Sequence, residues 1–281
     1  MWLLYAVSAV VCTTTLALLF RTISQRSHSS RAFAFVFNTT ALIISVFLVS
    51  INGIGVIVLN EYLYVLLIIS GIGYGIFQRY QFSVRKNIEA SVLQTIATPA
   101  SIAGYVLAVI WLGESVTIQK IIGYSCILLA GLVVIRPKKT NFIVNKYFIV
   151  TILITMSLSI AGTIDRRVAP QFSSALTYTL VIWLFQSFAV AVPRLSIKAI
   201  REEASLHSWR IPVLAAINIL ALYFTISALK IAPVSQVSPV LACNVVFIAL
   251  FGIIFLKERD YVLHKLVAAL ITFVGLFFIS R

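Results

Sequence analysis

Polar side chains recur at helical spacing inside the long apolar stretches of this chain. Five of them follow one another at steps of three or four residues, which places them on one face of a helix: Ser91, Gln94, Thr98, Ser101 and Tyr105. Hydroxyl and amide groups donate and accept hydrogen bonds, so this face could bind the polar groups of a small solute. Single serines and threonines more often join helices, but a row of five is harder to explain in that way.

Other apolar stretches carry similar polar faces. Ser70, Tyr74, Gln78 and Gln81 share one face, and Trp183 and Gln186 lie together on another stretch. The residues that we expect to contact a solute are Tyr74, Gln78, Gln94, Thr98, Ser101, Asn218, Gln236 and Asn244. Two glycines, Gly71 and Gly75, form a GxxxG pattern that is typical of close contact between helices.

Catalytic chemistry finds little support in the sequence. No HExxH motif, paired carboxylates or activated nucleophile is present, and the three histidines lie in connections or at the ends of apolar stretches. We therefore expect no enzyme, no metal and no cofactor. None of the eight acidic residues lies in the middle of an apolar stretch, which predicts a neutral, hydrogen-bonding cavity. Glu114 and Glu258 are expected to act in turns, and Asp165 to pair with a neighbouring arginine.

The elements that must position these residues follow from composition. Hydrophobic residues make up 61% of the chain and charged residues 11%, too few to cover a soluble domain. Charge-free runs of membrane-spanning length or close to it occupy residues 2–20, 32–60, 62–78, 90–113, 147–164, 168–193, 211–229 and 231–256. Two shorter runs, 121–135 and 266–280, are extended by flanking residues. We predict an all-α integral membrane protein with ten transmembrane helices.

The basic residues lie mainly in connections, which argues against nucleic acid as the partner of this strongly basic chain. Of the 22 Lys and Arg residues, 17 fall in connections on one side of the predicted membrane and 5 on the other. The positive-inside rule then places both termini outside the cytoplasm. We expect a multi-pass protein of the cell (inner) membrane, in contact with the lipid bilayer; the sequence leaves a homodimer open.

An internal repeat divides the chain into two halves. At an offset of 144 residues, Ser83, Lys86, Ser91, Glu114 and Gly131 match Ser227, Lys230, Ser235, Glu258 and Gly275. The halves, residues 1–138 and 146–281, would each contain five spans. Because five is odd, the second half must cross the membrane in the opposite sense to the first. Inverted repeats are typical of secondary transporters, whose solute site lies between the repeats.

Residues 99–137 and 232–280 resemble the EamA family of the drug/metabolite transporter superfamily. Each stretch has a Gly/Lys–Glu turn, "LGES" and "LKER", followed by a span with a late glycine. The resemblance implies a cavity surrounded by six of the ten spans, counted along the chain as 1, 3, 4, 6, 8 and 9 (residues 2–20, 62–78, 90–113, 147–164, 211–229 and 231–256). Span 7, residues 168–193, would lie further out. Trp183 and Gln186 belong to span 7 and do not fit this arrangement. Many members of this family resemble proteins whose termini lie in the cytoplasm. The Lys and Arg count of this chain instead places its termini outside the cytoplasm.

The function predicted from these patterns is secondary transport, such as metabolite export, of a small neutral or zwitterionic solute by alternating access. A membrane scaffold or receptor is the alternative, and it would be favoured if the polar faces packed without leaving a cavity. An intramembrane enzyme is a weaker alternative. Pro239 lies deep within its predicted span and frees a carbonyl one turn back, so we expect a kink there.

Overall fold

The computed structural model describes residues 1–88, 93, 103–134, 146–192, 195–255 and 262–279. Within these residues the regular secondary structure is helical, and one isolated bridge joins two connections. The helices are α1 (Trp2–Arg26), α2 (Ser30–Asn52), α3 (Glu61–Asn87), α5 (Ile118–Val134), α6 (Lys146–Val168), the short 3-10 helix η1 (Ala169–Gln171), α7 (Ala175–Ala191), α8 (Ile197–His207), α9 (Arg210–Ile231), α10 (Val234–Ala242), α11 (Asn244–Phe255) and α12 (Val262–Ile279). The all-α class predicted from the sequence is confirmed.

Five of the described helices are long and apolar enough to cross a membrane: α1, α2, α3, α6 with its extension to Gln171, and α9. Shorter apolar helices occupy Ala103–Leu112, Ile118–Ala130, Ala175–Ala191 and Val234–Ile248. Large apolar side chains such as Ile43, Phe47 and Phe188 are exposed on the outside of the molecule. Soluble proteins rarely expose so much contiguous apolar surface. The chain is therefore an integral membrane protein.

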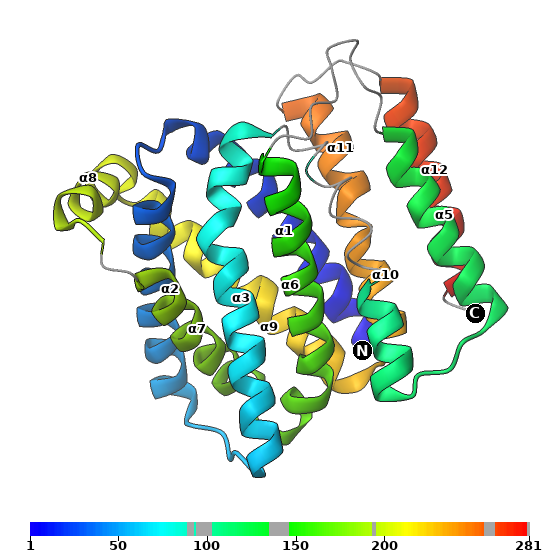
Figure 1. Ribbon diagram of the computed structural model, residues 1–281, viewed down its shortest axis with the longest axis horizontal. Helices are drawn as coiled ribbons and strands as arrows, with labels where there is room; N and C mark the ends of the chain where they lie inside the picture. The colour runs from blue at the N-terminus through cyan, green and yellow to red at the C-terminus, as the bar shows by residue number, and fades with distance from the viewer. Residues whose placement is uncertain (89–92, 94–102, 135–145, 193–194, 256–261, 280–281) are drawn as a thin grey trace.

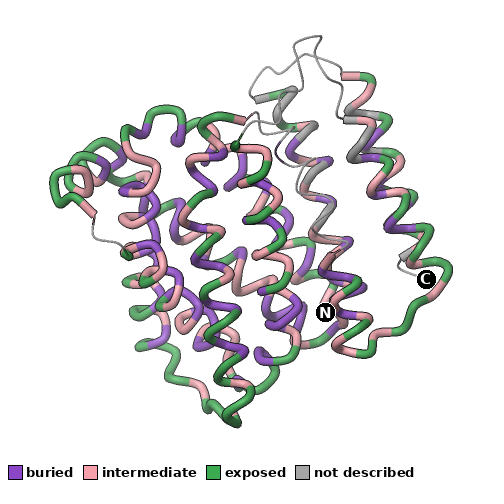
Figure 2. The backbone as a smooth tube through the Cα atoms, viewed as in Figure 1, coloured by how far each residue is buried: buried purple, intermediate pink, exposed green. Residues whose placement is uncertain are grey.

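The helices form one bundle and one separate pair. Helices α1, α2, α3, α6, α7 and α9 pack against one another, whereas α5 and α12 lie side by side at one edge (Figure 1). Helices α10 and α11 lie between this pair and the bundle, against α1. Buried residues follow the inner faces of the bundle, and exposed residues follow its outer faces (Figure 2).

Aromatic rings fill the bundle near one end of α1, α2 and α3. Phe20 lies edge-to-face with Phe37 and Phe82, with ring centroids 5.3 and 5.0 Å apart. Phe33 packs on Phe82 in the same way at 4.7 Å. Edge-to-face pairs add to the free energy gained from burial alone. This aromatic cluster fixes the relative positions of the three helices.

The helix geometry bears on two expectations. The span that contains Pro239 is divided into α10 and α11, but the break lies at Cys243, one turn after the proline, whereas the kink was expected from the carbonyl freed one turn before it. Gly71 and Gly75 face α7, where a Cβ added at either position would overlap Phe185 or Ala189. The missing side chains thus allow α3 and α7 to approach closely, as the GxxxG pattern predicts.

Helix α8 was not predicted as a separate element. It lies outside the bundle at one end of the molecule (Figure 1) and turns a single polar pair inward. Glu203 and His207 are 0% and 1% exposed, although they belong to a short, charged helix. The Glu203 carboxylate accepts a hydrogen bond of 2.6 Å from the backbone N–H of Ser29. This bond joins α8 to the start of α2.

Candidate functional site

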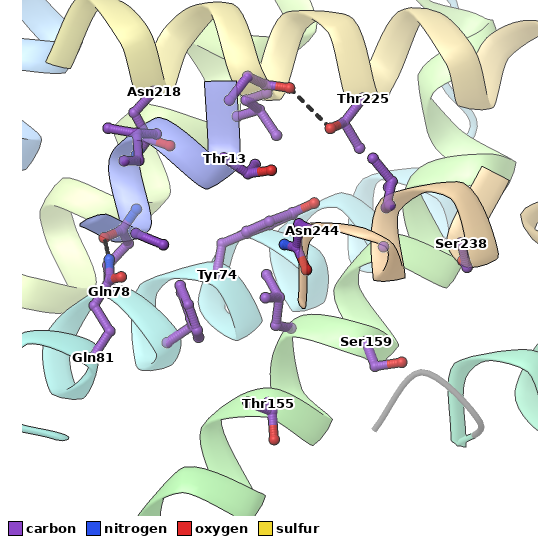
Figure 3. Close-up of a pocket in the computed structure, with 18 of the residues that line it drawn as sticks. Thr13, Tyr74, Gln78, Gln81, Thr155, Ser159, Asn218, Thr225, Ser238 and Asn244 are labelled. Atoms are coloured by element: carbon purple, nitrogen blue, oxygen red, sulfur yellow. Dashed lines mark hydrogen bonds between the residues drawn. The ribbon is translucent and has the colours of Figure 1, made fainter. Parts of the chain in front are cut away.

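A cavity of about 370 Å³ lies between helices from both halves of the chain. This is within the size range of sites for small organic ligands. Its wall combines apolar side chains with hydroxyl and amide groups from α1, α3, α6, α9, α10 and α11 (Figure 3). Each helix contributes the residues that share its inward face, at steps of three or four.

Four of the predicted site residues line this cavity: Tyr74 and Gln78 on α3, Asn218 on α9 and Asn244 at the start of α11 (Figure 3). Gln236 does not line it. Gln94, Thr98 and Ser101 lie outside the described residues. That the lining side chains bind a solute remains a prediction.

The inward face of α3 continues further than the prediction. Tyr74, Gln78, Gln81 and Arg85 follow at steps of four, three and four residues, and all of them line the cavity. The side-chain amide of Gln81 donates a hydrogen bond to the Gln78 carbonyl oxygen. The same spacing that selected Tyr74 and Gln78 could have identified Gln81 and Arg85 as site residues.

Helix α7 also reaches the cavity. Trp183 and Gln186 are each 1% exposed and belong to its lining, although the family resemblance implied a peripheral position. The indole N–H of Trp183 and the amide oxygen of Gln186 have no hydrogen-bond partner within the described part of the chain. Both groups are therefore buried and unpaired beside the cavity.

Within the described part of the chain Asp165 pairs with no arginine, contrary to the expectation from the sequence. It is 0% exposed, and its carboxylate accepts hydrogen bonds from the hydroxyls of Ser70, Tyr74 and Tyr178 at 2.6, 2.6 and 2.5 Å. A neighbouring cation, Arg166, instead donates to the carbonyl of Leu229. Three donors compensate the carboxylate for the loss of water.

The position of Tyr74 connects this carboxylate to the cavity. The Tyr74 side chain lines the cavity while its hydroxyl is bound to Asp165. Asp165 itself is not part of the lining. One carboxylate is therefore buried one side chain away from the cavity, although it lies near the end of α6 and not in the middle of the span.

Arg85 is the second departure from a neutral cavity. From the sequence it is expected among the charges of a connection, but it lines the cavity near the end of α3. Its guanidinium lies 5.5 Å from the centroid of the Phe20 ring, and its Nε is buried without a hydrogen-bond partner in the described residues. The cavity wall thus carries a positive charge.

Glu114 acts at a helix terminus, as expected. Its two carboxylate oxygens accept the backbone N–H groups of Val234 and Ser235 at 2.8 and 2.9 Å, which caps the start of α10. Glu258 lies outside the described residues. Among the residues that the structure describes, no group of three His, Cys, Asp or Glu side chains could hold a metal ion.

Comparisons with known proteins agree with this architecture. Residues 145–281 match the profile of the EamA-like transporter family. A solved structure described only as "Crystal structure of protein" is similar with a TM-score of 0.68 at 15% identity, covering 99% of this chain and 95% of that one. At this identity the similarity concerns the fold alone. No curated protein matches the sequence. The resemblance noted from the sequence is confirmed by this family match over residues 145–281.

Proposed function

We propose that this protein is a secondary transporter that moves a small neutral or zwitterionic metabolite, such as an amino acid or a related solute, by alternating access. The observation that carries the proposal is the cavity of about 370 Å³ lined by helices of both halves. A scaffold would be expected to pack its polar faces without such a space. The family match over residues 145–281 supports transport in particular.

The helix contacts support a division into two inverted halves, residues 1–138 and 146–281. The offset of 144 relates α1 to α6, α2 to α7, α3 to α9 and α5 to α12. If each helix is replaced by its related helix, the contact of α3 with α6 corresponds to that of α9 with α1. In the same way the contact of α3 with α7 corresponds to that of α9 with α2. All four contacts are present. The pair α5 and α12 maps onto itself. Contacts that occur in related pairs favour a two-fold relation between the halves.

Two repeat-related lysines make matching contacts as well. Lys86 at the end of α3 donates to the Ser27 carbonyl at 2.8 Å, in the connection between α1 and α2. Lys230 at the end of α9 donates to the Phe172 carbonyl at 2.6 Å, in the connection before α7. Each lysine thus ties the third helix of its half to the connection between the first two. Such matching contacts are expected when one half of a transporter moves against the other during alternating access.

Uptake into proteoliposomes tests the proposal. The purified protein would be offered radiolabelled amino acids and nucleosides, with Asn218→Ala as the site variant and Asn52→Ala, at the exposed end of α2, as the matched control. We expect uptake by the unmodified protein and Asn52→Ala, and its loss in Asn218→Ala without loss of thermal stability. Unchanged uptake in Asn218→Ala would remove this cavity from the transport path.

A further inference from the structure

We propose that Arg85 is the anion-binding residue of the cavity and that the transported solute carries a carboxylate. This inference rests on the proposed function, because it treats the cavity as a solute site. The solute must present a carboxylate to the guanidinium. Of the solutes proposed above this retains the zwitterions and excludes the uncharged ones, and it adds monocarboxylates.

The neighbouring basic residues are already engaged by helix ends. Arg21 donates to the carbonyls of Arg85 and Ile88 at 2.6 and 2.8 Å, where α3 ends. Lys86 donates to Ser27, and Arg79 donates to the carbonyl of Val192, just beyond α7. Cations at helix C-termini satisfy carbonyls that lack an intrahelical partner. These three side chains therefore have a structural role.

For the Arg85 guanidinium no such contact is found among the described residues. The guanidinium carbon lies 5.5 Å from the centroid of the Phe20 ring. The buried Nε has no acceptor in the described part of the chain. No described carboxylate forms an ion pair with it. An N–H donor that is buried without an acceptor costs free energy. A ligand anion in the cavity would supply the missing acceptors.

The position of this guanidinium is set before any ligand arrives. The backbone of Arg85 is held by Arg21 through its carbonyl. The ring beneath the side chain, Phe20, is wedged between Phe37 and Phe82 in edge-to-face contacts. A cation over an aromatic face gains electrostatic stabilisation. Binding an anion therefore needs little further ordering of the side chain.

The lining favours a carboxylate over a phosphate. Arg85 is the one basic residue among the described residues of the lining, and none of them is acidic. A single guanidinium matches a carboxylate by two parallel hydrogen bonds and balances its single charge. A phosphate ester carries nearly two charges at neutral pH. The rest of the solute would meet Leu16, Phe77, Leu158 and Leu222, with Trp183 and Gln186 offering one donor and one acceptor.

Thermal stability of the purified protein in detergent measures binding directly, independently of transport. Matched probes differ only in the carboxylate: leucine and leucinamide, phenylalanine and phenylalaninamide, 3-phenylpropionate and 3-phenylpropanamide, with phenyl phosphate as the phosphate arm. The variants are Arg85→Gln, which removes the charge, and Arg85→Lys, which keeps it. Arg26→Gln is the control, because Arg26 is an exposed cation in the last turn of α1 and does not line the cavity.

We expect at least one carboxylate to raise the melting temperature of the unmodified protein and of Arg26→Gln, while its amide does not. In Arg85→Gln the affinity should fall roughly tenfold or more, with a smaller loss in Arg85→Lys. The inference is overturned if Arg85→Gln keeps the shift, if the amides or phenyl phosphate stabilise as well as the carboxylates, or if no carboxylate stabilises the unmodified protein at about 10 mM. If Arg85→Gln does not fold, the comparison of acid with amide and the Arg85→Lys variant decide.

The two proposals fail in different ways. Carboxylate binding that depends on Arg85, without uptake into proteoliposomes, would retain this inference and reject transport. Uptake of the amides, which lack the carboxylate, at the rate of the acids would retain transport and reject the inference.

Discussion

At the scale of residues, the buried carboxylate of Asp165 is the feature that departs most from the sequence analysis. A carboxylate in an apolar bundle is stable when hydrogen bonds replace its water. Here the donors are Ser70 and Tyr74, from a helix more than 90 residues earlier in the chain, and Tyr178, from the next helix. The position of Asp165 near a helix end suggested exposure, and its partners became evident only when α3 and α7 were placed beside α6.

Removing one of these donors should destabilise the protein. We expect Tyr178→Phe to lower the free energy of unfolding by about 1.5–3 kcal/mol, since a hydrogen bond to a charged group is lost. Thermal unfolding in detergent measures the effect. Tyr124→Phe is the matched control, because the buried Tyr124 hydroxyl has no partner in the described part of the chain. Equal stability of the two variants would show that the Tyr178 hydroxyl contributes little.

His207 on α8 should make stability depend on pH. Burial lowers its pKa below the ordinary value of 6.5, an effect that the nearby Glu203 partly opposes and Arg210 reinforces. The unfolded chain therefore takes up a proton before the folded protein does, and stability falls as the pH drops below about 6.5. We expect melting temperatures to decline between pH 7.5 and pH 5.5, less steeply in His207→Gln. His28→Asn, at an exposed histidine, is the control. The same slope in His207→Gln as in the unmodified protein would contradict the assignment.

At the scale of elements, the apolar runs predicted the long helices well, because lipid requires the backbone to bond within each segment. The run that begins at residue 2 and the charge-free runs 147–164 and 211–229 correspond to α1, α6 and α9. Helix α8 was missed because only Glu203 and His207 on it are buried, and their burial depends on contacts with α2. The inward position of Arg85 was not predicted. Its closeness to a connection was given more weight than its helical spacing from Tyr74, which places both residues on one face of α3.

The contact between α3 and α7 should tolerate no added methyl group. Gly75→Ala would place a Cβ against that of Ala189, and overpacking of this kind costs about 1–3 kcal/mol. Thermal unfolding should show a lower melting temperature. Gly162→Ala in α6 is the control, since nothing lies within 4 Å of the position of its Cβ. Gly75→Ala with the stability of Gly162→Ala would mean that the two helices are less tightly packed than described.

At the scale of the whole molecule, the distribution of basic residues predicts the orientation. With 17 of 22 Lys and Arg on one side, both termini should lie outside the cytoplasm. A C-terminal alkaline phosphatase fusion, which is active only outside the cytoplasm, should be active, and a C-terminal green fluorescent protein fusion should be dark. The reverse pattern would establish the cytoplasmic termini that the family resemblance implied.

Alternating access requires that the cavity be reached from each side of the membrane in turn. It is tested most directly by labelling a single cysteine at Ser238, on the cavity wall (Figure 3), after replacement of Cys12, Cys126 and Cys243. The control is Ala215→Cys, at a position in the packed core with 0% exposure. We predict that a membrane-impermeant thiol reagent labels Ser238→Cys from either side and leaves Ala215→Cys unlabelled. Labelling of Ser238→Cys from one side only, with or without solute, would contradict alternating access.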